Sequence, residues 1–157
     1  MSLYFGPYFF ENEEGQAEKI NGARYRTMLE MFLRPAIQDN QQIWFQQDGA
    51  TAHTAKPTMK ILREIFGKRI ISKNSEFNWP PRSPDLTAPD FFLWGYLKNR
   101  VYINKPKTIQ DLKDNIKAEI QTLTPETLRT VMESALKRAC ICEQQNGCHL
   151  TDVVYHT

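Results

Sequence analysis

The fold class is decided by one stretch, Ile43-Trp44-Phe45-Gln46-Gln47-Asp48-Gly49. Its apolar first half closes on an Asp-Gly pair, and short apolar runs that end in such a turn are typical of buried strands. The stretch therefore predicts a strand that delivers Asp48 to the carboxyl edge of a sheet.

A helix and a second strand follow this stretch. Apolar residues recur at helical spacing at Met59, Leu62 and Phe66. We expect Thr54 to cap the helix and Gly67 to end it before a strand at residues 69–72. A strand, a helix and a strand in this order predict at least two parallel strands, and hence an α/β fold.

Further elements are predicted on both sides of this unit. The aromatic run at residues 3–10 predicts a strand in which Pro7 takes an edge or irregular position. Asn21 is expected to cap a helix that Pro35 kinks or ends. The proline-rich segment at residues 74–89 predicts a loop.

The part of the chain from about residue 87 onward is expected to be helical. Thr108 with Asp111 has the pattern of a capping box. Thr124 is followed by a proline, which is the pattern of another helix start. The length and the hydrophobic content suit one compact domain over residues 1–157.

Composition limits the compartment and the partners. No run of the sequence approaches the roughly 18 apolar residues that a membrane span needs, so we expect a soluble intracellular protein with no membrane partner. The three cysteines are odd in number and too few for a disulfide framework, which favours a reducing compartment. Cys140, Cys142 and Cys148 match no common zinc pattern, so reduced thiols are preferred to a zinc site.

Charge is distributed unevenly along the chain. Residues 54–117 hold 13 basic and 6 acidic side chains, whereas the rest of the chain holds 7 basic and 12 acidic ones. A basic segment of this kind suits an anionic partner such as a phosphate backbone. Solvated helix faces give the same count, so charge alone does not decide between the two interpretations.

Asp48 and Asp90 each have an ordinary explanation. Asp-Gly is a favoured turn pair, and Asp90 lies three positions after Thr87 at a helix start, where it resembles a capping-box acid. Together, however, a carboxylate after a buried strand and another at a helix start can converge on one cleft. Two such acids can each hold one divalent ion, and a pair of ions supports phosphodiester chemistry.

Two long motifs stand in order along the chain, and they resemble those of the mariner-type (Tc/mariner superfamily) transposases. Residues 43–54 resemble the segment that holds the second catalytic acid of that family, and residues 79–90 resemble the segment that holds the third. The family's third acid lies seven positions after the serine of the Ser-Pro-Asp-Leu run, which selects Asp90 over Asp85. Gly6-Pro7-Tyr8-Phe9-Phe10 looks like the family's third strand.

The resemblance implies a ribonuclease-H-like fold, a mixed sheet flanked by helices, with an acid triad that binds Mg²⁺ or Mn²⁺. It also implies cleavage and strand transfer at transposon ends, and thus an endonuclease that acts in DNA transposition and integration in the nucleus. The family's first acid lies on a strand upstream of the one that residues 6–10 resemble, and Glu11, Glu13, Glu14 and Asp39 lie where they cannot replace it. We therefore expect a partial catalytic domain that lacks the first strands of the fold and is inactive alone.

Other side chains are candidates around the two acids. His53, five positions after Asp48, is expected to act beside the metal site, although a helix-start histidine bonded to backbone is an equally good explanation. Trp44 and Trp94 can stack on bases, but core packing is the preferred interpretation. The candidate contacts to the DNA backbone are five cations: Arg82, Lys98, Arg100, Lys105 and Lys107.

Two functions are consistent with these patterns. The first is a DNA-binding remnant of a transposase catalytic domain, which binds DNA without sequence specificity because the family's helix-turn-helix modules have no counterpart in this sequence. The alternative is a non-enzymatic scaffold for protein contacts that keeps the fold. DNA binding that weakens with salt is expected only of the first. A homodimer is a further candidate assembly.

Overall fold

The computed structural model describes residues 6–40, 42–80 and 83–147, and the chain divides into two compact units, Met1–Arg82 and Ser83–Thr157. The described residues form a mixed α/β structure that is mostly helical and contains a two-stranded parallel sheet. The predicted α/β class is therefore confirmed. The finer ribonuclease-H-like arrangement stays a prediction, as does the single domain over the whole chain.

The sheet lies in the first unit and has the predicted strand–helix–strand order. Strand β1 (Phe45–Gln46) pairs in parallel with β2 (Ile70–Ile71), and Phe45 lies opposite Ile70. Gly67 ends the connecting helix as predicted, with φ 62° and ψ −119°, a backbone conformation that glycine adopts most readily. Both strands are shorter than the sequence suggested.

Helix α4 (Lys56–Phe66) connects the two strands, and its start differs from the prediction. It buries the three residues predicted for its inner face, Met59, Leu62 and Phe66. Its N-cap residue is Ala55, because Thr54 is the last residue of a short helix, α3 (Thr51–Thr54). The Thr54 hydroxyl donates to the backbone oxygen of Ala50 at 3.1 Å. Thr54 therefore does not cap α4.

A longer helical stretch precedes β1. Its segments are α1 (Gly22–Met28), the π-helical η1 (Leu29–Leu33) and α2 (Arg34–Ala36). Asn21 caps α1 as predicted, since its side-chain oxygen accepts a hydrogen bond from Arg24 N at 3.0 Å. Pro35 lies in the last short segment, and the helix ends after it, as predicted.

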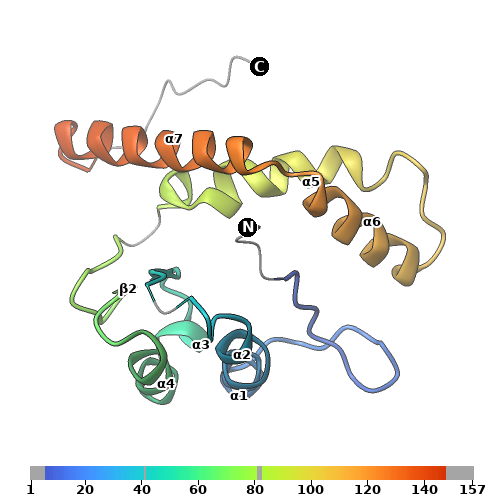
Figure 1. Cartoon of the computed structure of the whole chain (residues 1–157), viewed down its shortest axis with the longest axis horizontal. Helices are drawn as coiled ribbons and strands as arrows, with labels where there is room; N and C mark the ends of the chain where they lie inside the picture. The colour runs from blue at the N-terminus through green and yellow to red at the C-terminus, as the bar shows by residue number, and fades with distance from the viewer. Residues whose placement is uncertain (1–5, 41, 81–82, 148–157) are drawn as a thin grey trace. The chain divides into compact units, whose positions relative to one another are not determined.

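A hydrophobic core joins these helices to the sheet. Its buried members are Tyr25, Leu29, Ile37, Met59, Leu62, Phe66 and Ile70. The rings of Phe45 and Phe66 stack with their centroids 4.9 Å apart, which holds β1 against α4. Figure 1 shows α1 and α4 side by side, both nearly end-on. This packing fixes the strand ends that carry the candidate site.

The strand predicted at residues 3–10 is absent from the part of it that is described. Residues 6–10 have no strand conformation, and residues 1–5 lie outside the described residues. Phe10 O accepts a hydrogen bond from Glu18 N at 2.8 Å, and an antiparallel bridge joins Glu11 to Ala17. The end of the segment therefore bonds to the turn that follows it.

The described part of the second unit is helical, as predicted. Its elements are the 3₁₀-helix η2 (Pro84–Leu86), the π-helical η3 (Pro89–Leu93), α5 (Trp94–Arg100), α6 (Ile109–Gln121) and α7 (Pro125–Gln144). Two predicted caps are confirmed. Thr108 and Asp111 form a capping box at α6, and Thr124 Oγ1 accepts from Thr127 N at 3.1 Å at α7.

The helix start around Asp90 differs from the prediction. Thr87 Oγ1 donates to the backbone oxygen of Ser83 at 3.1 Å, and Asp90 N donates to the backbone oxygen of Thr87 at 2.8 Å. The expected capping box of Thr87 and Asp90 is therefore wrong, because the threonine hydroxyl is bound one turn back.

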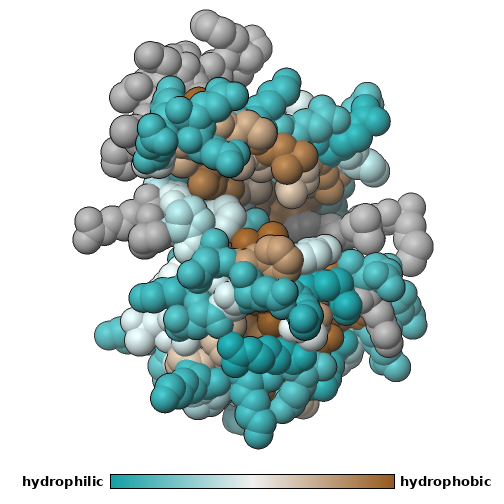
Figure 2. All heavy atoms as spheres, turned by 90° about the vertical axis from the view of Figure 1, so that its left-hand side faces the viewer, coloured by the Kyte–Doolittle hydropathy of each residue, from teal (hydrophilic) through white to brown (hydrophobic). Residues whose placement is uncertain are grey.

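Several large apolar side chains are exposed. Trp44 and Trp94 are 50% and 58% exposed, so the prediction that both belong to the core is wrong. On α7, Met132 and Leu136 are 54% and 67% exposed, whereas Val131 is buried. Figure 2 shows one face of the molecule, on which hydrophobic surface areas lie among hydrophilic surface areas.

Helix α7 holds two of the cysteines. Cys140 and Cys142 are free thiols within it, and Cys148 lies outside the described residues. Among the described helices, none combines the length and the apolar character needed to cross a membrane.

Candidate functional site

Asp48 follows the last residues of β1, at the carboxyl edge of the sheet where the sequence predicts it. Its Oδ1 atom accepts a hydrogen bond from Ala50 N at 3.0 Å, which closes the Asp-Gly turn. Its side chain is 55% exposed. The carboxylate is therefore held by its own turn and remains partly exposed.

His53 is brought onto Asp48 by the short helix α3. His53 Nδ1 lies in hydrogen-bond contact with Asp48 Oδ1, so with an ionised carboxylate this ring nitrogen is the donor. The His53 ring also lies against the Tyr25 ring, with centroids 4.3 Å apart and planes at 34°. His53 thus contacts Asp48 directly, while its role beside a metal site stays a prediction.

The buried side-chain amide of Gln47 holds Tyr25 and His53 in this arrangement beside Asp48. Gln47 is only 7% exposed, and its Oε1 accepts from the Tyr25 hydroxyl at 2.9 Å. Its Nε2 donates to the backbone oxygen of His53 at 3.1 Å and to Ser72 Oγ at 3.0 Å. One side chain therefore links α1, both strand ends and the segment that carries His53.

The sequence interpretation missed Gln47 and Tyr25 as members of the site. The signal for Gln47 was the period-two pattern of a strand, which places it on the same face as Phe45 and hence toward the core. A polar residue at such a position needs partners, because an unbonded buried amide is costly. Tyr25 carried no comparable signal, since its place on a helical apolar face suggested only packing.

Tyr25 stays protonated beside Asp48. Burial raises the pKa of the Tyr25 hydroxyl well above its usual range, and the negative charge of Asp48 raises it further. The neutral hydroxyl remains a hydrogen-bond donor to Gln47 throughout the physiological range. The polar group next to the carboxylate thus adds no second negative charge.

The donor set around Asp48 fits one ligand position of a divalent ion. Asp48 Oδ1 is hydrogen-bonded to Ala50 N and to His53 Nδ1, whereas no described residue forms a hydrogen bond with Oδ2. Within the described ranges, no three His, Cys, Asp or Glu side chains are grouped so that they could hold a metal ion. Mg²⁺ is commonly bound by one or two protein carboxylates, with waters and phosphate oxygens as its other ligands.

Asp90 belongs to the second unit. It lies on η3, and its side chain is exposed. Asp48 belongs to the first unit, so the predicted pairing of the two carboxylates rests on the sequence motifs alone.

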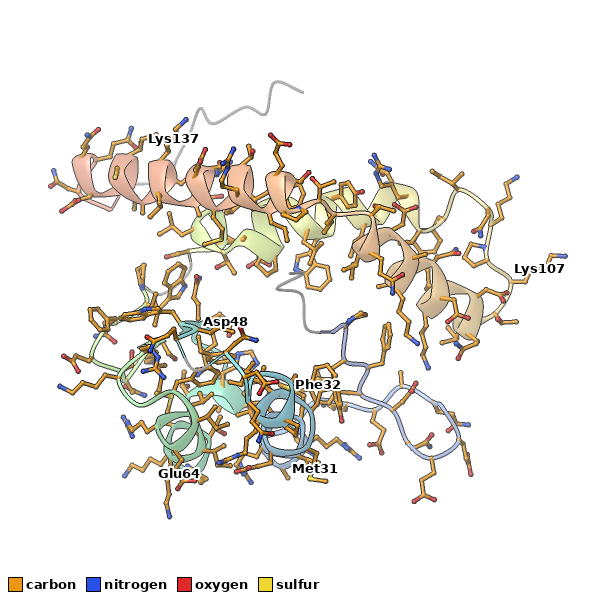
Figure 3. The ribbon with its side chains drawn as sticks, viewed as in Figure 1. Met31, Phe32, Asp48, Glu64, Lys107 and Lys137 are labelled. Carbon is orange, nitrogen blue, oxygen red and sulfur yellow. The ribbon has the colours of Figure 1, made fainter. Side chains whose placement is uncertain are left out.

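The four described cations of the predicted DNA contact are all exposed. Lys98 and Arg100 lie on α5, where Arg100 is 3.7 Å from a Glu119 oxygen and its guanidinium lies over the Tyr96 ring at 4.5 Å. Lys105 and Lys107 lie in the segment before α6, and Figure 3 shows Lys107 pointing away from the helices. Arg82 lies outside the described residues.

Comparisons with known proteins add no family assignment. No protein-family model matches the chain, and no curated protein matches it.

Proposed function

We propose that this chain supplies Asp48 and Asp90 as two of three metal-binding carboxylates in a catalytic domain like that of mariner-type transposases, with DNA as substrate in the nucleus. The observation that carries the proposal is the state of Asp48. One carboxylate oxygen is fixed by Ala50 N and His53 at the carboxyl edge of β1, and no described residue bonds the other. Such a carboxylate is oriented before any ligand arrives.

The residues of the chain have separate tasks in this proposal. Divalent ions, when bound, supply activation of the attacking oxygen and stabilisation of the leaving oxygen of the phosphodiester. Asp48 and Asp90 would hold these ions. His53 fixes the rotamer of Asp48, and Gln47 holds the backbone of His53 at 3.1 Å, so both act by positioning.

A third carboxylate is part of the proposal, and the motifs that resemble the family supply no counterpart for it. In the resembled family it lies on a strand upstream of the one that residues 6–10 resemble. We therefore propose that residues 1–157 alone bind metal weakly and do not cut DNA.

The test measures Mn²⁺ binding, and the electron paramagnetic resonance signal of the free ion reports how much Mn²⁺ remains unbound. We expect Asp48→Asn and Asp90→Asn each to weaken binding by about tenfold or more, because each removes a ligand. Asp39→Asn is the matched control, since Asp39 is also exposed and lies outside the motifs. Equal affinity in the wild type and the Asp48→Asn variant, or an equal loss in Asp39→Asn, would contradict the proposal.

A second candidate, a non-enzymatic scaffold, is favoured by one observation. Met132 and Leu136 leave an apolar strip of α7 exposed, and exposed apolar patches are common at protein contacts. This function requires no affinity for DNA. A gel shift at low salt separates the two, because only the transposase-like function predicts a complex that higher salt dissolves.

A further inference from the structure

One face of helix α4 carries three cations. Lys56, Lys60 and Arg63 follow one another at helical spacing, and all three are exposed. The inner face of the helix holds the buried residues Thr58, Met59, Leu62 and Phe66, and the cations border that face. Lys56 and Lys60 are separated by about 6 Å along the helix axis. The three charges therefore form a row along the outer side of the helix.

Lys73 lies beside the turn that carries Asp48. A Cβ atom placed on Gly49 would be 4.0 Å from Lys73 Cδ, so the stem of Lys73 passes next to the Asp48–Gly49 turn. The backbone around Lys73 is held by Ser75, whose hydroxyl accepts from Ser72 N at 3.1 Å and lies 2.8 Å from Phe77 O. Lys73 is thus an exposed cation on a fixed turn.

A hydrogen bond joins the helix row to this turn. Arg63 Nη2 donates to the backbone oxygen of Asn74 at 2.9 Å, one residue after Lys73. The row and the turn therefore form one continuous surface, which we call the α4 stripe: Lys56, Lys60, Arg63 and Lys73. The stripe runs along α4 and ends beside Asp48.

Two glutamates near the stripe are paired with other cations. Glu64 lies 3.7 Å from an Arg34 nitrogen, and Glu76 lies 3.5 Å from Lys68 Nζ. Figure 3 shows Glu64 and Asp48 on different sides of the first unit. In the described part of the chain, no carboxylate forms an ion pair with Lys56, Lys60 or Lys73. These three lysines are therefore exposed and are not held in direct ion pairs within the described residues.

We propose that the α4 stripe binds the phosphate backbone of duplex DNA and leads it to the carboxylate of Asp48. The choice of DNA rests on the proposed function, while the binding surface rests on the row of exposed cations. Lysines recognise phosphate as point charges and carry no sequence information, so the stripe binds without sequence preference. This assigns DNA contacts to four named cations of the first unit within the basic segment 54–117, whereas the DNA contacts named from the sequence lie at residues 82–107.

The experiment measures the affinity of the whole chain for a labelled duplex of about 20 bp by fluorescence anisotropy, from roughly 50 to 200 mM NaCl. EDTA is present, so the result does not depend on a metal site. The stripe variant is Lys56→Gln/Lys60→Gln/Lys73→Gln. The control variant is Lys19→Gln/Lys117→Gln/Lys137→Gln, which removes the same charge from three other exposed lysines.

The expected result is a change in both affinity and salt dependence. The stripe variant should bind at least about tenfold more weakly, and the slope of log K against log salt should fall by roughly one for each lysine lost. The control variant should keep most of the slope. If the stripe variant fails to fold by circular dichroism, Lys73→Gln alone should lower the slope by about one.

Three outcomes would overturn the inference: no complex with the wild type, an unchanged slope in the stripe variant, or an equal loss in the control variant. These outcomes are distinct from failure of the metal proposal. Mn²⁺ binding that depends on Asp48 without a DNA complex would keep the metal site and reject the stripe.

Discussion

Gln47 is the residue that connects the fold to the candidate site. Its amide accepts from Tyr25 and donates to Ser72 and to the backbone of His53, while the residue itself is almost completely buried. Each of these bonds satisfies a polar group that has little or no access to water. The position of His53 on Asp48 therefore depends on a side chain that touches neither a ligand nor solvent.

We expect Gln47→Leu to destabilise the protein by about 2–4 kcal/mol, because it removes the acceptor of the buried Tyr25 hydroxyl and the amide donor to Ser72 Oγ and the His53 backbone oxygen. Urea unfolding measures the change. Gln46→Leu is the control, since Gln46 is exposed and should change stability by no more than about 0.5 kcal/mol.

A double variant checks the cause of that loss. Adding Tyr25→Phe to Gln47→Leu removes one of the groups that lost its partner, so the double variant should be more stable than the sum of the two single effects by about 1 kcal/mol. Strict additivity would show that the hydrogen bond between Tyr25 and Gln47 contributes nothing.

At the scale of elements, the threonines show what local sequence can predict. Thr108 and Thr124 cap their helices as expected, because a capping residue and its partner lie within one turn of sequence. Thr54 and Thr87 do not, and both fail in the same way. Each donates its hydroxyl to the carbonyl four residues earlier, a local alternative that a pattern of residue types does not distinguish.

Gly67 is the element boundary with the clearest backbone requirement. We expect Gly67→Ala to destabilise by about 1–3 kcal/mol, because φ 62° with ψ −119° is unfavourable for any residue with a Cβ atom. Gly95→Ala is the matched control. An added Cβ meets nothing within 4 Å at either position, but Gly95 lies inside α5, where alanine should stabilise by about 0.5–1 kcal/mol.

Thermal unfolding of the two variants measures both effects. Shifts of the same sign in Gly67→Ala and Gly95→Ala would contradict this account, since steric space is equal and only the backbone conformation differs.

At the scale of the whole molecule, the order of elements was predictable and the environment of single residues was not. The order β1, α4 and β2 followed from the apolar run before Asp48, the helical spacing of Met59, Leu62 and Phe66, and Gly67. Exposure of Trp44 and Trp94 was not predictable, because the sequence shows that a residue is apolar and not whether another element covers it. The pairing of Asp48 with Asp90 stays a prediction of the motifs.

Activity is the prediction that belongs to the whole chain. Residues 1–157 should not cut labelled transposon-end DNA with Mg²⁺ or Mn²⁺, whereas a version extended upstream by the resembled family's first two strands should. Without the third carboxylate, the two ions are not fixed at the separation of about 4 Å that in-line displacement needs. Gel analysis of the cleavage products measures the difference.

The control is Asp90→Ala in the extended version. It should abolish cleavage and leave the thermal unfolding curve unchanged, because Asp90 is exposed. Robust cutting by residues 1–157, or by the extended Asp90→Ala variant, would disprove the account based on three carboxylates.

The π-helical segment η3, which holds Asp90, also affects how related sequences should be aligned. A π-helical turn contains one more residue than an α-helical turn, and one residue corresponds to a rotation of about 100° around the helix axis. The side chains of α5 are therefore rotated relative to those expected from an uninterrupted helix that starts at Ala88. An evolutionary relative with one residue fewer between Pro89 and Leu93 and an α-helical turn there would present the same face of α5, because the π-helical turn absorbs the extra residue. A correct alignment of such a relative with this chain therefore needs a one-residue gap inside the helix, although gaps inside helices are usually penalised.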